Sequence, residues 1–270
     1  MQFALYLPIA REFADARLLA DLAREAEDAG WDGFFVWDHI ALAPRGEPWP
    51  LADPWVALSA IAAATTRIRL GPMVTPLPRR RPAKVARETV TLDHLSGGRL
   101  VLGVGLGGAD RSDFAALGED PDPRIRAEKL DEALEVVTGL WRGEPFSFEG
   151  KHFRIEDVTF LPRPPQEPRI PIWVGGVWPR RAPAHRAARW DGMFPVSTEW
   201  PRERLTPDDY RELKEFIGRD PFDLVFTTTW GHEGEPADVD AYEEAGVTWW
   251  LQEAQTLAVA RRRIAAGPPS

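Results

Sequence analysis

The chain has 270 residues, of which 44% are hydrophobic and 28% are charged, as in ordinary globular proteins. It contains no cysteine, which excludes disulfides, thiolate metal ligands and thiol catalysis. Its formal net charge of −9 argues against broad nucleic-acid binding, because such binding requires a basic face.

The amino-terminal segment lacks the pattern of a secretory leader. It has no basic start, and it turns polar at Arg11. No apolar run approaches the roughly 18–20 residues that are needed to cross a bilayer. We therefore expect a cytoplasmic protein whose partners include neither a membrane nor a nucleic acid.

Short β-branched or aromatic runs alternate with longer amphipathic runs in the first half of the chain. The strands predicted there are residues 3–7, 33–37, 68–74 and 100–104. The predicted helices are residues 14–29, a helix that begins at Asp53-Pro54, and residues 82–95. Asp53 suits the N-cap and Pro54 the first helical position, and Gly97-Gly98 should end the helix at 82–95.

The same alternation continues in the second half. The strands predicted there are residues 170–174, 192–196, 224–228 and 248–252. The helices predicted between and after them are residues 179–189, 207–217, 237–244 and 257–265. Eight strand–helix units predict an α/β fold, namely a (β/α)8 TIM barrel that forms a single domain over residues 1–270. An open doubly wound sheet is the rival, but it seldom has so many regular units.

An excess of residues separates the fourth and fifth predicted strands. Residues 144–168 include the segment FSFEGKHFRIEDVTFLPRPP, which predicts a small hairpin followed by a proline-rich return. We interpret this segment as an insertion in the barrel and not as a second domain.

In a parallel barrel, functional groups lie where the strands run into the following loops. The residues at these places are Trp37, Asp38 and His39; Val74, Thr75 and Pro76, with a basic run at 79–81; Gly105, Leu106, Gly107 and Gly108; Gly175, Gly176, Val177 and Trp178; residues 228–230; and Gln252 and Glu253. The basic run either meets a phosphate or is simply solvated.

Two of these loops are rich in glycine. Residues 103–108 match the G-x-G-x-x-G pattern of dinucleotide-binding folds, but no strand ending in an acidic residue follows. Gly175-Gly176 is the better phosphate candidate, because a predicted helix begins after it and free amides at a helix start favour an anion. Both loops also fit a simpler interpretation as tight strand-to-helix turns.

His39 fits several roles: a proton donor, a hydrogen-bond donor to a cofactor, a metal ligand or a structural histidine. The chain has no H-x-H or H-E-x-x-H spacing, so we predict no metal site. Several tryptophans at or near strand ends either wall a flat ring or pack the core. They are Trp37, Trp178, Trp230, Trp249 and Trp250.

Three blocks of the sequence carry a family resemblance. They are residues 53–108, which include TLDHLSGGRLVLGVG; residues 30–39, GWDGFFVWDH; and residues 170–195, which include IPIWVGG and RAARWDGMFP. Together they resemble the luciferase-like monooxygenase family of flavin- or coenzyme F420-dependent oxidoreductases. The resemblance covers nearly the whole chain and implies a (β/α)8 barrel that binds reduced FMN or F420.

The resemblance also implies a role for individual residues. Asp38 and His39 would face the cofactor ring or the substrate, with His39 as the catalytic residue. Val74 and Thr75 would back the ring, in a turn where many relatives have a non-prolyl cis peptide. The segments implied to hold the ribityl chain and phosphate are Gly105, Leu106, Gly107 and Gly108, and Gly175, Gly176 and Val177.

The choice of cofactor sets the expected reaction. FMN implies a monooxygenase, whereas F420 implies hydride transfer. We favour reduced FMN acting on a small organic substrate, because the acidic tail of F420 would favour more lysines near the mouth. Some F420-dependent dehydrogenases have a glutamate after the fourth strand. This chain reads GLGGAD there, with Asp110 the nearest carboxylate, which argues against a sugar-phosphate dehydrogenase.

The expected partners are a small-molecule substrate, a separate flavin reductase and a second copy of the chain in a homodimer. A flavin-binding barrel without catalysis is an alternative within the same family. A Schiff-base aldolase is a poor alternative, because none of the few lysines falls at a predicted strand end.

Overall fold

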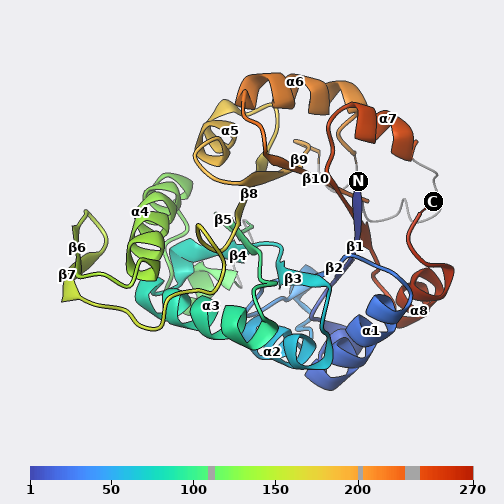
Figure 1. Cartoon of the computed structure of the whole chain (residues 1–270), viewed down its shortest axis with the longest axis horizontal. Coiled ribbons are helices and arrows are strands. Elements are labelled where there is room, and N and C mark those ends of the chain that lie inside the picture. Colours follow the sequence, from blue (N-terminus) through green and yellow to red (C-terminus); the bar gives the residue numbers. More distant parts are fainter. Residues whose placement is uncertain (109–112, 200–202, 229–237, 270) are drawn as a thin grey trace.

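A parallel sheet that closes into a barrel forms the centre of the molecule, and helices surround it (Figure 1). The computed structural model describes residues 1–108, 113–199, 203–228 and 238–269. The strand order is β3-β2-β1-β11-β10-β9-β8-β5-β4, and every pairing within it is parallel. The predicted (β/α)8 fold is confirmed.

The barrel strands are short and follow the predicted runs closely. They are β1 (Gln2–Leu7), β2 (Gly33–Val36), β3 (Arg69–Pro72), β4 (Thr75–Pro76), β5 (Leu102–Gly105), β8 (Ile172–Val177), β9 (Gly192–Val196), β10 (Asp223–Thr227) and β11 (Trp249–Glu253).

The helices lie outside the barrel. They are α1 (Ala16–Asp28), α2 (Pro54–Ala64), α3 (Pro82–Ser96), α4 (Pro123–Trp141), α5 (Arg181–Ala187), α6 (Pro207–Ile217), α7 (Val239–Glu244) and α8 (Leu257–Ala266). The predicted cap of α2 is confirmed, because the Asp53 carboxylate accepts hydrogen bonds from the amides of Trp55 and Val56, both at 2.9 Å. Gly97 ends α3 in the left-handed conformation with φ 69°.

The third position of the barrel is shared by two short strands. β3 pairs with β2, and β4 pairs with β5; the peptide bond between Met73 and Val74, which lies between the two strands, is cis. A parallel bridge between Leu70 and Leu100 closes the ring. The prediction of one continuous strand over residues 68–74 is therefore wrong in its second half. The chain stops pairing with β2 after Pro72 and begins to pair with β5 at Thr75.

The fifth barrel strand is longer than predicted. Gly175, Gly176 and Val177 pair with β9 as the last residues of β8, so they are not loop residues. The amide of Trp178 still donates to the carbonyl of Val196 at 2.9 Å, which keeps the chain extended there. For this reason α5 begins at Arg181, later than the predicted start at residue 179.

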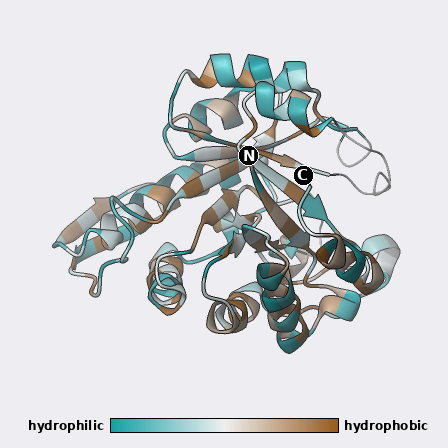
Figure 2. Ribbon diagram, turned by 45° about the vertical axis from the view of Figure 1, so that its right-hand side comes forward, coloured by the Kyte–Doolittle hydropathy of each residue, from teal (hydrophilic) through white to brown (hydrophobic). Residues whose placement is uncertain are grey.

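Aromatic side chains fill much of the barrel. The rings of Phe35, Trp173 and Trp249 contact one another with centroids 5.3–5.8 Å apart. Four of the tryptophans considered above are buried: Trp37, Trp178, Trp249 and Trp250. Trp230 lies outside the described residues. Figure 2 shows the barrel strands mostly hydrophobic and the outward side of helices such as α6 hydrophilic.

The predicted insertion is a hairpin between the fourth and fifth barrel strands. β6 (Phe146–Glu149) and β7 (Arg154–Val158) pair antiparallel and lie beside α4 (Figure 1). The Phe146 ring packs where a side chain at Gly139 would lie. Among the described residues, no helix is both long enough and apolar enough to span a membrane.

Gly71 lies at the seam where the barrel closes. A Cβ atom at this position would come 2.0 Å from the carbonyl oxygen of Val101, which is backbone and cannot move aside cheaply. We expect Gly71→Ala to lower the free energy of unfolding by about 3 kcal/mol, measured by urea denaturation.

Gly30→Ala is the matched control. A Cβ atom at Gly30 would meet no neighbouring atom within 4 Å, but the residue has φ +94°. Its substitution should therefore cost only the strain of a side chain in the left-handed conformation, about 1–2 kcal/mol. Equal losses in the two variants would show that the seam does not require glycine.

Candidate active site

Most of the predicted site residues meet at one end of the barrel. Asp38 and His39 follow β2 closely, and Val74 and Thr75 lie where β3 passes into β4. Pairing of β4 with β5, and of β5 with β8, brings both glycine segments beside them. Barrel closure therefore assembles one site from four separate segments of the sequence.

The carboxylate of Asp38 is buried and bonded on both oxygens. Oδ1 accepts from Nη2 of Arg79 at 2.6 Å, and Oδ2 accepts from the Thr75 hydroxyl at 2.6 Å. Nη2 of Arg80 lies 2.9 Å from each oxygen. Asp38 thus binds Thr75 and both arginines, and the direct cofactor contacts that the resemblance implies for Asp38 and Thr75 stay predictions.

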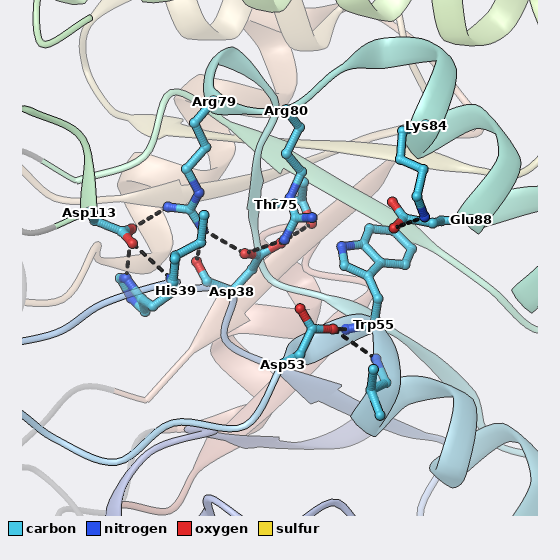
Figure 3. Close-up of polar contacts among 12 residues, drawn as sticks. Asp38, His39, Asp53, Trp55, Thr75, Arg79, Arg80, Lys84, Glu88 and Asp113 are labelled. Atoms are coloured by element: carbon cyan, nitrogen blue, oxygen red, sulfur yellow. Dashed lines mark hydrogen bonds and ion pairs between the residues drawn. The ribbon is translucent and has the colours of Figure 1, made fainter. Parts of the chain in front are cut away.

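Arg79 lies between two aspartates (Figure 3). One guanidinium nitrogen donates to Asp38 and the other to Asp113, and neither the Arg79 nor the Asp38 side chain is exposed. Buried charges cost several kcal/mol each unless they are paired. Here two carboxylates balance the guanidinium groups of Arg79 and Arg80. The network joins the segments that follow β2, β4 and β5.

The basic run at 79–81 divides into three environments. Arg79 is buried in the network, whereas Arg80 is 15% exposed and stacks its guanidinium group 5.8 Å from the ring of Trp55. Arg81 is exposed. The interpretation that the whole run is simply solvated is therefore wrong, because Arg81 alone of the three arginines is exposed.

His39 is the accessible titratable group of the network. Its Nδ1 lies 3.1 Å from Oδ2 of Asp113, and its side chain is 27% exposed. No described residue bonds its Nε2. The ring also meets the edge of Trp37, with centroids 5.8 Å apart. Within the described part of the chain, one nitrogen of His39 thus has no hydrogen-bond partner.

Asp113 is held ionised by its partners. It also accepts from the amides of Ile40 at 2.8 Å and Ala41 at 3.3 Å. Burial alone would raise the pKa of Asp113, but the hydrogen bond from His39, the charge of Arg79 and the Ile40 amide lower that pKa to about 2.

Val74 lies between two glycines. A Cβ atom on Gly105 would come 2.7 Å from Cγ2 of Val74, and one on Gly175 would come 3.0 Å from its Cγ1. Val74 remains partly exposed. Because the two glycines have no side chains, Val74 fits between the ends of β5 and β8 and offers an apolar surface there. We call this surface the Val74 floor.

The loop after β5 turns its carbonyl groups toward α4. Nη1 of Arg126 lies 3.3, 3.4 and 3.0 Å from the carbonyl oxygens of Leu106, Gly107 and Gly108. In a trans peptide the N–H points opposite to the C=O, so the amides of Gly107 and Gly108 face away from Arg126. Successive amides that face one side suit an anion or a hydroxyl.

The glycines of β8 have a packing role as well. A Cβ atom on Gly176 would come 2.3 Å from Cβ of Pro183 in α5. Gly175, Gly176 and Val177 are each partly exposed. The strand end is therefore accessible, but glycine at 176 is already required by the contact between β8 and α5.

The model of the luciferase-like monooxygenase family matches residues 1–262. The chain belongs to this family. The resemblance seen in the sequence is confirmed, and the residues that it implies for the site lie mostly at the barrel end described above.

The luciferase-like chain is similar to proteins of several activities. It is 35% identical over 183 residues to an F420-dependent glucose-6-phosphate dehydrogenase of Nakamurella multipartita, over 64% of this chain and 50% of that protein. The chain thus spans about half the length of this curated relative. An F420-dependent secondary alcohol dehydrogenase superposes with TM-score 0.75 at 19% identity, over 96% and 95% of the two chains. Monooxygenase RslO1 of Streptomyces bottropensis gives TM-score 0.69 at 25% identity, over 99% and 80%.

Two members of the site escaped the sequence analysis. Asp113 and Arg126 lie beyond the glycine loop, and neither forms a motif with the residue that it contacts. Phe114, the residue directly after Asp113, is the sequence feature that could have pointed to them. Its ring centroid lies 5.7 Å from the guanidinium carbon of Arg79 and 4.6 Å from that of Arg126. Asp110, the carboxylate considered in the sequence, lies outside the described residues.

Among the described residues, no group of three or more His, Cys, Asp or Glu side chains is arranged to hold a metal ion.

Removing Arg79 should destabilise the barrel strongly. Arg79→Met would leave two buried carboxylates without their shared partner, and we expect a loss of about 3–5 kcal/mol in the free energy of unfolding. The control is Arg81→Met, whose exposed side chain should change stability by about 0.5 kcal/mol or less. Urea denaturation at pH 7 measures both variants, and similar losses would contradict the proposed importance of the buried network.

Proposed function

We propose that the chain is an oxidoreductase that holds a flavin-type cofactor at the barrel mouth and exchanges a proton with its substrate through His39. Coenzyme F420 is the cofactor that we now favour. The observation that supports this proposal most strongly is the partly exposed His39, whose Nε2 no described residue bonds, at the same end of the barrel as Val74.

The residues at the mouth fit such a cofactor. A flat conjugated ring needs an apolar surface, and Val74 between Gly105 and Gly175 offers one. A polyol-phosphate chain needs hydrogen-bond donors, and the amides of Gly107 and Gly108 face away from Arg126. These contacts would position the cofactor, and the cofactor would supply the hydride chemistry.

His39 would complete the reaction with a proton. In the oxidation of an alcohol, the neutral imidazole would take the hydroxyl proton at Nε2, and F420 would supply the hydride acceptor. The products would be a carbonyl compound, an imidazolium group and the reduced cofactor. In the reverse direction the imidazolium returns the proton.

Two arguments favour F420 over FMN. The F420-dependent relative is 35% identical over most of this chain. The shortage of lysine, which favoured FMN, loses its force because arginine binds carboxylates and phosphates at least as well, and the chain is rich in arginine. The lack of a glutamate in the GLGGAD loop still favours a small alcohol or carbonyl substrate over a sugar phosphate.

A monooxygenase that uses reduced FMN is the second candidate. It is favoured by the similarity to monooxygenase RslO1, which extends over 99% of this chain. In that case a separate flavin reductase would be a natural partner. A homodimer and a cytoplasmic location are further proposals that the same family assignment motivates.

Cofactor titration tests the proposal directly. We expect F420 to quench tryptophan fluorescence of the purified chain with a Kd below about 100 μM, equivalent to roughly 5.5 kcal/mol, and to bind more tightly than reduced FMN. Tighter binding of FMN would favour the monooxygenase. Failure of both cofactors to bind would remove the proposal.

His39→Ala should separate chemistry from binding. We expect turnover of a panel of small alcohols to fall by about 10²–10⁴-fold, with the cofactor Kd unchanged, because the proton acceptor is lost. His94→Ala is the matched control, since His94 bonds the carbonyl of Arg163 at 2.8 Å, in the return segment that follows the hairpin. Undiminished turnover in His39→Ala would exclude its proton-transfer role.

Val74→Ala should weaken cofactor binding. Loss of two methyl groups from the floor removes about 1.5 kcal/mol of apolar contact, which is roughly tenfold in Kd. Val158→Ala on the hairpin, with an exposed side chain, controls for general effects of the substitution. The same cofactor titration measures both, and an unchanged Kd in Val74→Ala would place the ring elsewhere.

A further inference from the structure

The segment that carries His39 wraps around the Asp113 carboxylate. Oδ2 faces Nδ1 of His39 at 3.1 Å, while Oδ1 accepts from the next two amides of the same segment, those of Ile40 and Ala41. Arg79 holds the carboxylate from the other side. With four donors and 2% exposure, Asp113 cannot rotate without losing several of these bonds.

This arrangement assigns the protons of the imidazole. Because the pKa of Asp113 is lowered to about 2, the carboxylate is ionised near neutral pH and can only accept hydrogen bonds. Nδ1 of His39 must then carry a hydrogen atom. In the neutral ring, Nε2 is left with a lone pair, and it is Nε2 that no described residue bonds.

The described charges around His39 balance one another in sign. The described charged groups of the network that faces it are Asp113, Asp38, Arg79 and Arg80, two of each sign. A neutral imidazole therefore leaves the network balanced, and protonation at Nε2 adds one charge next to Asp113.

We propose that Asp113 is the positioning residue of the site: it fixes the hydrogen atom on Nδ1 of His39 and leaves Nε2 as the atom that exchanges a proton with the substrate. The role deepens the proposed function and rests on it. Asp113 itself stays ionised throughout, since Arg79 and two amides donate hydrogen bonds to its carboxylate and stabilise the charged form.

The tautomer can be measured without cofactor or substrate. In the full ¹⁵N-labelled chain, two-bond ¹H–¹⁵N spectra between pH 5 and 9 report the protonation of each imidazole nitrogen, and His39→Gln identifies the signals of His39. We expect the neutral ring to carry its hydrogen on Nδ1. A dominant Nε2–H form in the wild-type chain would overturn the proposal, whether or not any variant folds.

Asp113→Asn tests the cause of this preference. We expect the preference of the neutral His39 ring for hydrogen on Nδ1 to weaken, because a side-chain amide, unlike a carboxylate, can also donate to Nδ1 and no longer requires a hydrogen atom there. His152, which bonds Glu128 near the hairpin, serves as the internal control and should keep its own tautomer. An unchanged tautomer for His39 in the folded variant would contradict the role of Asp113.

Kinetics then distinguish this role from the proposed function. We expect Asp113→Asn to lower kcat by roughly 10- to 100-fold, with cofactor Kd unchanged and the pH profile displaced, and Asp113→Glu to recover part of the loss. A wild-type chain that binds no cofactor would refute the proposed function and leave the tautomer result intact. A wild-type chain that turns over normally with the Nε2–H tautomer would refute only the role of Asp113.

Discussion

The shape of the barrel mouth depends on Arg79 and the two aspartates that it joins. Asp38 lies 41 residues before Arg79, and Asp113 lies 34 residues after it, so three separate strand ends are tied together by one side chain. Each ion would be costly to bury alone, and the network is tolerable only when all of its members are present. The fully buried charged groups are thereby paired with one another. His39, at the edge of the network, is the described group that we propose can contact a ligand.

The closure of the barrel and the floor of the site involve the same short stretch of chain. Between β3 and β4 the backbone passes from β2 to β5, and this step places Val74 between Gly105 and Gly175. The glycines are therefore required by packing, and they also keep the strand ends open. The sequence analysis treated tight packing and the approach of a ligand as alternative reasons for these glycines. In the structure the two reasons are compatible, because the lack of a side chain at each glycine permits both.

The luciferase-like family includes relatives named as dehydrogenases and as monooxygenases. The features found here suit either chemistry, because they consist of an apolar floor, a set of outward amides and an imidazole nitrogen that no described residue bonds. In the proposed function such a site would orient a cofactor and handle a proton, whereas the electron chemistry would belong to the cofactor. The identity of the cofactor therefore decides the reaction more than any single side chain does.

The sequence by itself determined the barrel and the family, and it predicted the barrel end at which the candidate site residues gather. Strand and helix periodicity, the Asp53 cap and the exact bounds of β9 and α6 depend on local patterns, which is why they could be predicted. Only the tertiary structure paired His39 with Asp113, 74 residues away, and gave the three arginines at 79–81 different environments. It also extended β8 through Gly175 and split the third strand. These features depend on which strands lie side by side, and a pattern along the chain does not record contacts between distant segments.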